Sequence, residues 1–190
     1  MLKAPPMLKA QTLIPLPPSQ PRSVQTTLLF TDIVGSTRHA VELGDVRWRK
    51  VFDRHDMLVR TEVAWAGGRL VKSLGDGYLA SFDDPSAAVD CAHALVAIAR
   101  SVGLEIRAGL HHGECQVVGD DFVGLAVHIA ARVCSLADGD RVLATDAVAG
   151  PAGHAHVTFA DQGCQELRGI PGCHHLYEAV QRAATLRLAS

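Results

Sequence analysis

The sequence predicts an α+β fold in which one mixed β-sheet carries helices mainly on one face. Short runs that alternate apolar and polar residues are interleaved with long runs whose apolar residues recur at three- and four-residue steps, which are the patterns of strands and helices. A Gly-Asp-Gly turn at 75–77 lies between two strand runs and indicates an antiparallel hairpin. The 190 residues are 48% hydrophobic, enough for one sizeable core. Interleaved elements with hairpin neighbours favour helices layered on a mixed sheet.

In the first half of the domain, the sequence pattern predicts four elements in this order: a strand at 26–34, a long helix at 36–66, a hairpin at 69–82 and a second long helix at 87–102. The first helix ends where Gly67 and Gly68 follow its last apolar residues. Asp84 and Pro85 begin the second helix, because an acidic cap and an early proline favour a helix start.

In the second half, the pattern predicts a long strand at 104–118 and an alanine-rich helix at 124–137. Three short strands follow at 140–145, 157–167 and 174–180. Small alanine side chains let a helix pack closely against a sheet. The last strands complete the sheet near the C-terminus.

The chain is expected to have a Pro-rich flexible tail at 1–25, one folded domain at 26–180 and a short tail at 181–190. The letters MLKA occur at 1–4 and again at 7–10, so both Met1 and Met7 remain candidate starts. The net charge is −2 with no long basic run, which argues against nucleic acid and membrane surfaces as partners. No apolar stretch approaches the roughly 20 residues of a membrane span, so a cytoplasmic protein is expected.

Five cysteines are scattered along the chain and form no CxxC pair. This pattern predicts reduced, mostly buried thiols rather than disulfides, and argues against a zinc site. The pairs His111-His112 and His174-His175 do not predict a metal site either, because adjacent residues of a strand point to opposite faces.

Asp32 stands inside an apolar run at the end of the first strand, where a charge is costly unless it is paired. Gly35, Ser36 and Thr37 follow at a helix start, whose unpaired backbone N–H groups suit a phosphate. A carboxylate beside a phosphate needs a cation between them. Alternatively, the Asp32 carboxylate caps the following turn. This stretch alone leaves both interpretations open.

Two other sets of polar residues are ambiguous when each is taken alone. Asp76 lies at the tip of the predicted hairpin, where a Gly-Asp-Gly sequence is ordinary turn chemistry, and Lys72 precedes it on the hairpin as a typical surface residue. His128 and Arg132 are four residues apart on one helix face. They are either surface or capping residues, or they line a cleft for an anionic ligand.

Four blocks of the sequence together resemble the signature of class III nucleotidyl cyclases. They stand in the family's order and at similar spacing, and the resemblance covers about 26–180. The blocks are FTDIVGST at 30–37, VKSLGDGYLASF at 71–82, IRAGLHHGE at 106–114 and GLAVHIAARV at 124–133. The resemblance implies a ferredoxin-like cyclase catalytic domain, most like that of a bacterial adenylate cyclase.

The resemblance implies two divalent cations, Mg²⁺ or Mn²⁺, held by Asp32, Asp76 and the backbone carbonyl of Ile33. The implied reaction is attack by the ribose 3′-oxygen of a nucleoside triphosphate on its own α-phosphorus, with loss of pyrophosphate. The turn at 35–37 would hold the terminal phosphates through backbone N–H groups.

The resemblance also assigns the residues that select the base and stabilise the transition state. Lys72 matches the lysine that donates to adenine N1, and Asp121 matches the aspartate that accepts from adenine N6, so the implied substrate is ATP. Asp120 is a neighbouring candidate, but Asp121 keeps the family spacing. Arg132 matches the arginine that stabilises the pentavalent transition state. Arg168 is a further candidate phosphate contact.

One position departs from the family, because His128 stands where an asparagine usually binds the ribose ring oxygen. A neutral imidazole donates one hydrogen bond but differs in reach. Three outcomes are open: a slower or pH-dependent cyclase, replacement of His128 by a neighbour, or near loss of turnover.

The family builds its sites between the two chains of a head-to-tail dimer, so a homodimer with two shared sites is implied. The alternatives are a promiscuous or guanylate cyclase, and a weakly active nucleotide-binding homologue that acts as a dimerisation or regulatory module.

Overall fold

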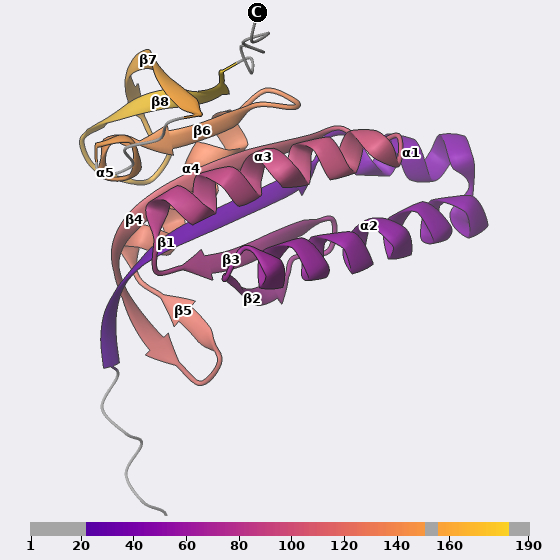
Figure 1. The fold of residues 1–190 in the computed structure, drawn as a ribbon, viewed down its shortest axis with the longest axis horizontal. Helices are drawn as coiled ribbons and strands as arrows, with labels where there is room; N and C mark the ends of the chain where they lie inside the picture. Colours follow the sequence, from indigo (N-terminus) through magenta and orange to yellow (C-terminus); the bar gives the residue numbers. More distant parts are fainter. Residues whose placement is uncertain (1–21, 151–155, 183–190) are drawn as a thin grey trace, which may run out of the picture.

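The computed structural model describes residues 22–150 and 156–182. Within them, eight strands form one sheet in the order β2-β3-β1-β4-β6-β8-β7, with β5 paired to β4 outside this path (Figure 1). The strands are β1 (Arg22–Ile33), β2 (Arg69–Ser73), β3 (Gly77–Phe82), β4 (Ile106–Val118), β5 (Asp121–Val123), β6 (Val142–Thr145), β7 (Val157–Glu166) and β8 (Cys173–Gln181). The helices are α1 (Ser36–Leu43), α2 (Asp45–Trp65), α3 (Pro85–Ser101), α4 (Leu125–Leu136) and α5 (Asp146–Ala149). Strands β4 and β6 run parallel and the other pairs antiparallel, which confirms the mixed sheet.

Helices α2 and α3 lie side by side on one face of the sheet, and α4 covers the opposite face (Figure 1). Alternation along β1 explains both layers, because Leu29 joins the core under α2 and α3 while Leu28 and Phe30 join the core under α4. Gly109 lets α4 approach closely, since a Cβ there would lie 2.1 Å from the backbone nitrogen of Cys134. The prediction of helices mainly on one face is confirmed, with α4 as the exception.

The predicted single helix over 36–66 is wrong, because it is broken at Gly44. This residue has φ 71° and ψ 155°, a conformation open to glycine that ends α1 before α2 begins. Helix α1 buries none of its residues, and Val41 is 79% exposed, so no core contact aligns α1 with α2. His55, Val59 and Val63 of α2 are buried as their spacing predicts. Among the described helices, none has both the length and the apolar character needed to cross a bilayer.

The start of the domain differs from the predicted boundary at residue 26. Strand β1 begins at Arg22, and residues 22–25 pair with β4 in a register that continues to Ile33 opposite Ile106. These residues therefore belong to the sheet and not to a tail, because β4 extends far enough to satisfy their backbone groups. Residues 1–21 and 183–190 of the predicted tails lie outside the described residues.

The cysteines correct a second prediction. Cys91, Cys115 and Cys134 are free and buried as expected, but Cys164 and Cys173 form a disulfide. Strands β7 and β8 pair as a hairpin, with Cys164 opposite His175 and Glu166 opposite Cys173, so the two cysteines meet at the base of the connecting loop. A separation of nine residues without a CxxC pattern did not indicate this contact, because strand pairing created it.

Candidate active site

Asp32 and Asp76 lie side by side at the ends of neighbouring strands. Asp32 pairs in register with Gly77, and the backbone nitrogen of Ile33 donates to the Asp76 carbonyl at 3.3 Å. A Cβ on Gly77 would lie 2.4 Å from the carbonyl oxygen of Thr31, so only glycine permits this close approach of β3 to β1. Both aspartates line one cavity of about 190 Å³. The structure thus brings together the two carboxylates that the sequence predicted as partners.

The described structure pairs Asp32 with Arg107, a residue that the sequence reasoning missed. Arg107 lies directly opposite Asp32 on β4 and donates to one carboxylate oxygen from Nε at 2.9 Å and from Nη2 at 2.5 Å. Its Nη1 donates to the Ser135 carbonyl of α4 at 3.2 Å. The position of Arg107 in the sequence could have indicated this pair, because an arginine between the apolar residues of a buried strand needs a partner of opposite charge as much as Asp32 does.

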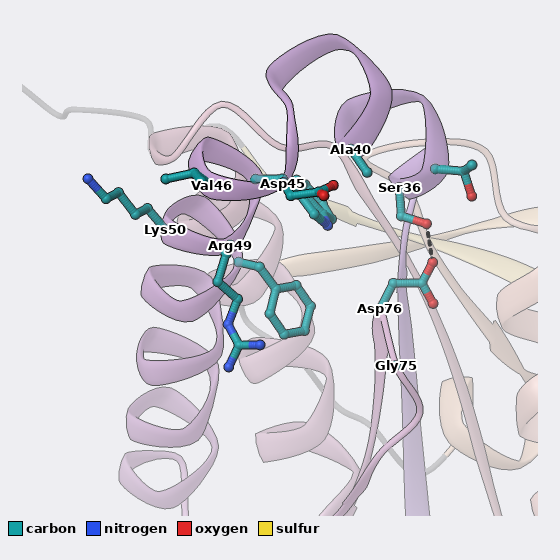
Figure 2. Close-up of a pocket in the computed structure, with 11 residues that line it drawn as sticks. Ser36, Ala40, Asp45, Val46, Arg49, Lys50, Gly75 and Asp76 are labelled. Carbon is teal, nitrogen blue, oxygen red and sulfur yellow. Dashed lines mark hydrogen bonds between the residues drawn. The ribbon is translucent and has the colours of Figure 1, made fainter.

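The turn after β1 directs a second polar group toward Asp76. Gly35 has φ 66°, in the left-handed region, and it begins α1 with Ser36 as the first helical residue. The Ser36 hydroxyl donates to the Asp76 carboxylate (Figure 2). Ser36, Thr37 and Asp76 therefore lie together, as expected for a phosphate site beside a metal ligand.

These residues form one wall of a cavity of about 910 Å³ between α1, the start of α2 and the β2–β3 turn. Figure 2 shows Ser36 and Asp76 on one side and Arg49 of α2 across from them. Trp48 and Phe52 of α2 add an aromatic surface to this cavity. The cavity is large enough for a nucleotide-sized ligand.

Lys72 and Asp121 form an ion pair between β2 and β5. Lys72 Nζ lies 2.6 Å from Asp121 Oδ2, and Asp121 Oδ1 accepts from the backbone N–H of Phe122 at 2.8 Å. The hydrogen bond from Lys72, and then that from the Phe122 backbone, lower the pKa of Asp121 below its usual value. Asp120 differs, because its backbone carbonyl, and not its carboxylate, accepts a hydrogen bond from Arg69 Nη1 at 3.0 Å. Of the two candidate aspartates, Asp121 is the one that contacts Lys72.

His128 and Arg132 lie on the exposed side of α4, whereas Ile129, Ala130 and Val133 face the core. Arg132 Nε donates to the backbone carbonyl of Arg168 at 3.2 Å, in the loop between β7 and β8. Arg168 is exposed beside it. The two α4 residues therefore share a surface with a third predicted residue, although none of the three lines the cavities that hold Asp32 and Asp76.

The described residues thus divide the predicted site into separate groups. One group is the two carboxylates with the turn at 35–37, a second is the Lys72–Asp121 pair, and a third is the exposed side of α4. Large apolar side chains are exposed on these elements or next to them, namely Leu74, Val118, Val123, Leu125 and Leu136. An apolar surface next to incomplete polar groups is typical of a face that another chain covers.

The chemistry of the carboxylate pair fits divalent cations. Among the described residues, no group of three or more His, Cys, Asp or Glu gathers as a ready metal site. Mg²⁺ is commonly bound by one or two carboxylates, with water and substrate phosphates completing its shell. Asp32 and Asp76 facing one cavity, beside a turn suited to phosphate, supply that donor set.

Comparison with known proteins finds similar sequences and a similar fold. An adenylate cyclase of Streptomyces coelicolor is 34% identical over 122 residues, which are 63% of this chain and 32% of that protein. A pH-sensitive adenylate cyclase of Mycobacterium tuberculosis is 30% identical over 176 residues, which are 87% of this chain and 43% of that protein. The crystal structure of the adenylyl cyclase CyaB from P. aeruginosa matches with a TM-score of 0.81 at 20% identity, over 88% of this chain and 100% of that chain.

The chain spans less than half the length of these two curated relatives. The model of the adenylate and guanylate cyclase catalytic domain matches residues 19–179, which is most of the chain. From this match and the fold, the chain belongs to the class III adenylate and guanylate cyclase catalytic domain family.

Proposed function

We propose that the chain converts ATP to 3′,5′-cyclic AMP and pyrophosphate. The ribose 3′-oxygen forms a bond to the α-phosphorus, and the bond between that phosphorus and the bridging oxygen to the β-phosphate breaks. The observation that carries the proposal is the pair Asp32 and Asp76, which face one cavity beside the phosphate turn at 35–37. This is the arrangement that phosphoryl transfer with divalent cations requires.

Two Mg²⁺ or Mn²⁺ ions, held by Asp32, Asp76 and the Ile33 carbonyl, would lower the pKa of the 3′-hydroxyl and neutralise developing charge. The protein's part is to orient the triphosphate. Backbone N–H groups at Gly35 and Ser36 would hold the terminal phosphates. The hydrogen bond from the Ser36 hydroxyl would keep the Asp76 carboxylate oriented toward the proposed site of these phosphates.

Selection of adenine rests on the Lys72–Asp121 pair. Its ammonium donates and its carboxylate accepts, which matches the acceptor N1 and donor N6 of adenine. The guanine edge has the reverse polarity and would leave both groups unpaired. The observed contact at 2.6 Å supports the pair as one recognition unit.

Lys72, Asp121, His128 and Arg132 of one chain would complete the site that holds the metal aspartates of the other chain. The Arg132 guanidinium would stabilise the charge of the pentavalent transition state, and His128 would donate to the ribose ring oxygen. Their exposure on α4, apart from the carboxylate cavities, supports a head-to-tail homodimer with two shared sites. Arg168 beside Arg132 would be a further phosphate contact.

We also propose that the domain works in the cytoplasm, where ATP and Mg²⁺ are available, and that neither nucleic acid nor a membrane is its partner. The net charge of −2, without a long basic run, supports the absence of nucleic-acid and membrane partners.

The decisive experiment measures cyclic nucleotide production from ATP and from GTP, with Mg²⁺ and with Mn²⁺. We expect ATP to be the preferred substrate. Asp76→Asn should abolish turnover, whereas Asp90→Asn, at an exposed carboxylate of α3, should retain it. A preference for GTP would support the guanylate cyclase alternative. Absence of product under all conditions would contradict an active cyclase and favour a nucleotide-binding module, the interpretation that His128 supports.

The His128 position has its own test. Turnover of wild type and His128→Asn should be measured side by side, because the two side chains differ in reach and in their hydrogen-bonding groups. We expect the asparagine variant to be faster. A variant no faster than wild type would show that His128 does not limit the rate.

A further inference from the structure

The loop between β7 and β8, residues 167–172, lies against the helix that carries Arg132. Leu167 and Ile170 are 2% and 9% exposed and pack in one cluster with Ile129 and Val133 of α4. The carbonyl of Arg168 between them accepts the hydrogen bond from Arg132 Nε at 3.2 Å. The loop therefore contacts both the apolar side of α4 and the Arg132 side chain.

The hydrogen bond is placed so that it orients the guanidinium group. It uses Nε, the nitrogen nearest the chain, so that the terminal nitrogens lie beyond it. Fixing Nε sets the plane of the group, and a planar guanidinium binds phosphate oxygens only from a suitable direction. The Arg168 carbonyl thus fixes the orientation of the Arg132 guanidinium group.

Apart from the packing of Leu167 and Ile170, the loop is held by a hydrogen bond from the Ile170 backbone N–H to the Leu167 carbonyl at 2.9 Å and by the Cys164–Cys173 disulfide. Gly169 and Gly172 have φ 79° and φ 88°, and glycines lose more conformational entropy on ordering than other residues. The loop also borders a hollow of about 730 Å³ that its own residues line. The Cys164–Cys173 disulfide closes the loop at its base, where it limits the conformations available to 167–172.

This disulfide is accessible to thiol chemistry, and the other cysteines are not. Cys164 and Cys173 are exposed, whereas the three free cysteines are buried. Burial raises the pKa of Cys91 and of Cys134 to about 12, so these thiols stay protonated and unreactive. A thiol reagent at neutral pH therefore acts selectively on the exposed pair.

We infer that the Cys164–Cys173 disulfide holds the β7–β8 loop so that the Arg168 carbonyl positions Arg132, and that reduction of the disulfide slows turnover. The inference rests on the proposed cyclase function. A thiolate of the dithiol attacks one cysteine sulfur, the S–S bond breaks and the other cysteine leaves as a thiol. The second thiol of the reductant then attacks the reductant sulfur of the mixed disulfide and releases the first cysteine as a thiol. Two electrons and two protons pass to the protein, which gains two thiols, while the dithiol becomes a disulfide. The Arg168 carbonyl is a positioning group and Arg132 is the group it positions.

The test compares protein oxidised with glutathione disulfide and protein reduced with dithiothreitol. Thiol titration of the denatured protein should give three thiols before and five after reduction, from the three free cysteines among five in total. With ATP as substrate, reduction should lower kcat by about tenfold, since misplacing a catalytic group by about 1 Å costs up to about a hundredfold. KM should stay within about twofold, because Arg132 acts mainly in the transition state.

Two variants separate positioning from general destabilisation. The double variant Cys164→Ser with Cys173→Ser should match reduced wild type and should not respond to dithiothreitol. In an Arg132→Ala background, reduction should cause no further loss of kcat, because the group that the loop positions is gone. A tenfold loss that persists in Arg132→Ala would overturn the inference, and so would equal kcat values for oxidised and reduced wild type, or five thiols before reduction.

Hydrogen exchange measured by mass spectrometry gives a readout that does not depend on activity. Reduction should speed exchange in peptides covering 165–173 and 125–136, and leave α3 unchanged. Unchanged exchange in both peptides would overturn the positioning claim even for an inactive protein. If oxidised wild type makes no cyclic nucleotide with any metal, the proposed function fails, and the exchange result still decides whether the disulfide orders the loop and α4.

Discussion

A mixing experiment tests most directly whether the site is shared between two chains. One chain carries Asp32→Ala and the other carries Arg132→Ala, and each homodimer should keep at most about a hundredth of the wild-type rate, because both of its sites lack one important group. In a mixed dimer, the metal carboxylates of the Arg132→Ala chain meet the intact Arg132 of the Asp32→Ala chain. One site of the two is then complete, and the other has both defects.

The expected magnitude follows from symmetry and from the separation of the groups. Arg132 does not line the cavities that contain Asp32 and Asp76, so the two lesions should fall on different half-sites. Equal amounts of freely exchanging chains give about half mixed dimers, each with one working site of two, and therefore about a quarter of the wild-type rate at equal total protein.

The assay is cyclic AMP production after the two chains are co-expressed or exchanged, with mixed dimers counted by native mass spectrometry. The matched control mixes Asp32→Ala with Asp76→Ala. Both of these lesions lie in the same half-site, so every mixed dimer should remain inactive. If the first mixture forms mixed dimers but recovers no activity, or if the control recovers as much as the first mixture, the head-to-tail arrangement is refuted.

Three further predictions address individual side chains. Arg107→Ala should lower the free energy of unfolding by about 1–3 kcal/mol, because it leaves the Asp32 carboxylate unpaired. In urea unfolding, Mg²⁺ should stabilise this variant more than it stabilises wild type. An equal effect on both proteins would argue against a cation at Asp32. Lys72→Glu places a second carboxylate beside Asp121. It should lower kcat/KM for ATP by about a hundredfold and raise the ratio of kcat/KM for GTP to kcat/KM for ATP. If that ratio does not change, base selection at this pair is contradicted. Burial, followed by the nearby His174 charge, lowers the pKa of His111 from 6.5 to about 4. The folded state therefore resists protonation, so stability should fall as pH falls from 6.5 to 4, and His111→Gln should reduce that dependence in urea unfolding; the same slope in the variant would contradict this assignment.

Most of the fold could be predicted from the sequence, because strand and helix patterns are local. The apolar run that predicted β1 is buried on both faces of the sheet, with Leu29 in the core under α2 and α3 and with Leu28 and Phe30 in the core under α4. The predicted cap at Asp84 is observed as a hydrogen bond that its carboxylate accepts from the Ser86 N–H. The break at Gly44 was not predicted, because the apolar steps continue across it. Gly44 takes a positive φ that ends α1, and α1 has no buried residue that would hold it in line with α2.

The sequence by itself determined which residues are candidates for the site, because the blocks around Asp32, Asp76 and Arg132 are short and chemically distinctive. Tertiary structure decided which of them meet and which other residues they contact. The Asp32–Arg107 pair joins residues 75 positions apart, and the Arg132–Arg168 contact joins residues 36 apart. Both depend on strand order, register and the seating of α4 on the sheet, and no local pattern encodes those long-range pairings.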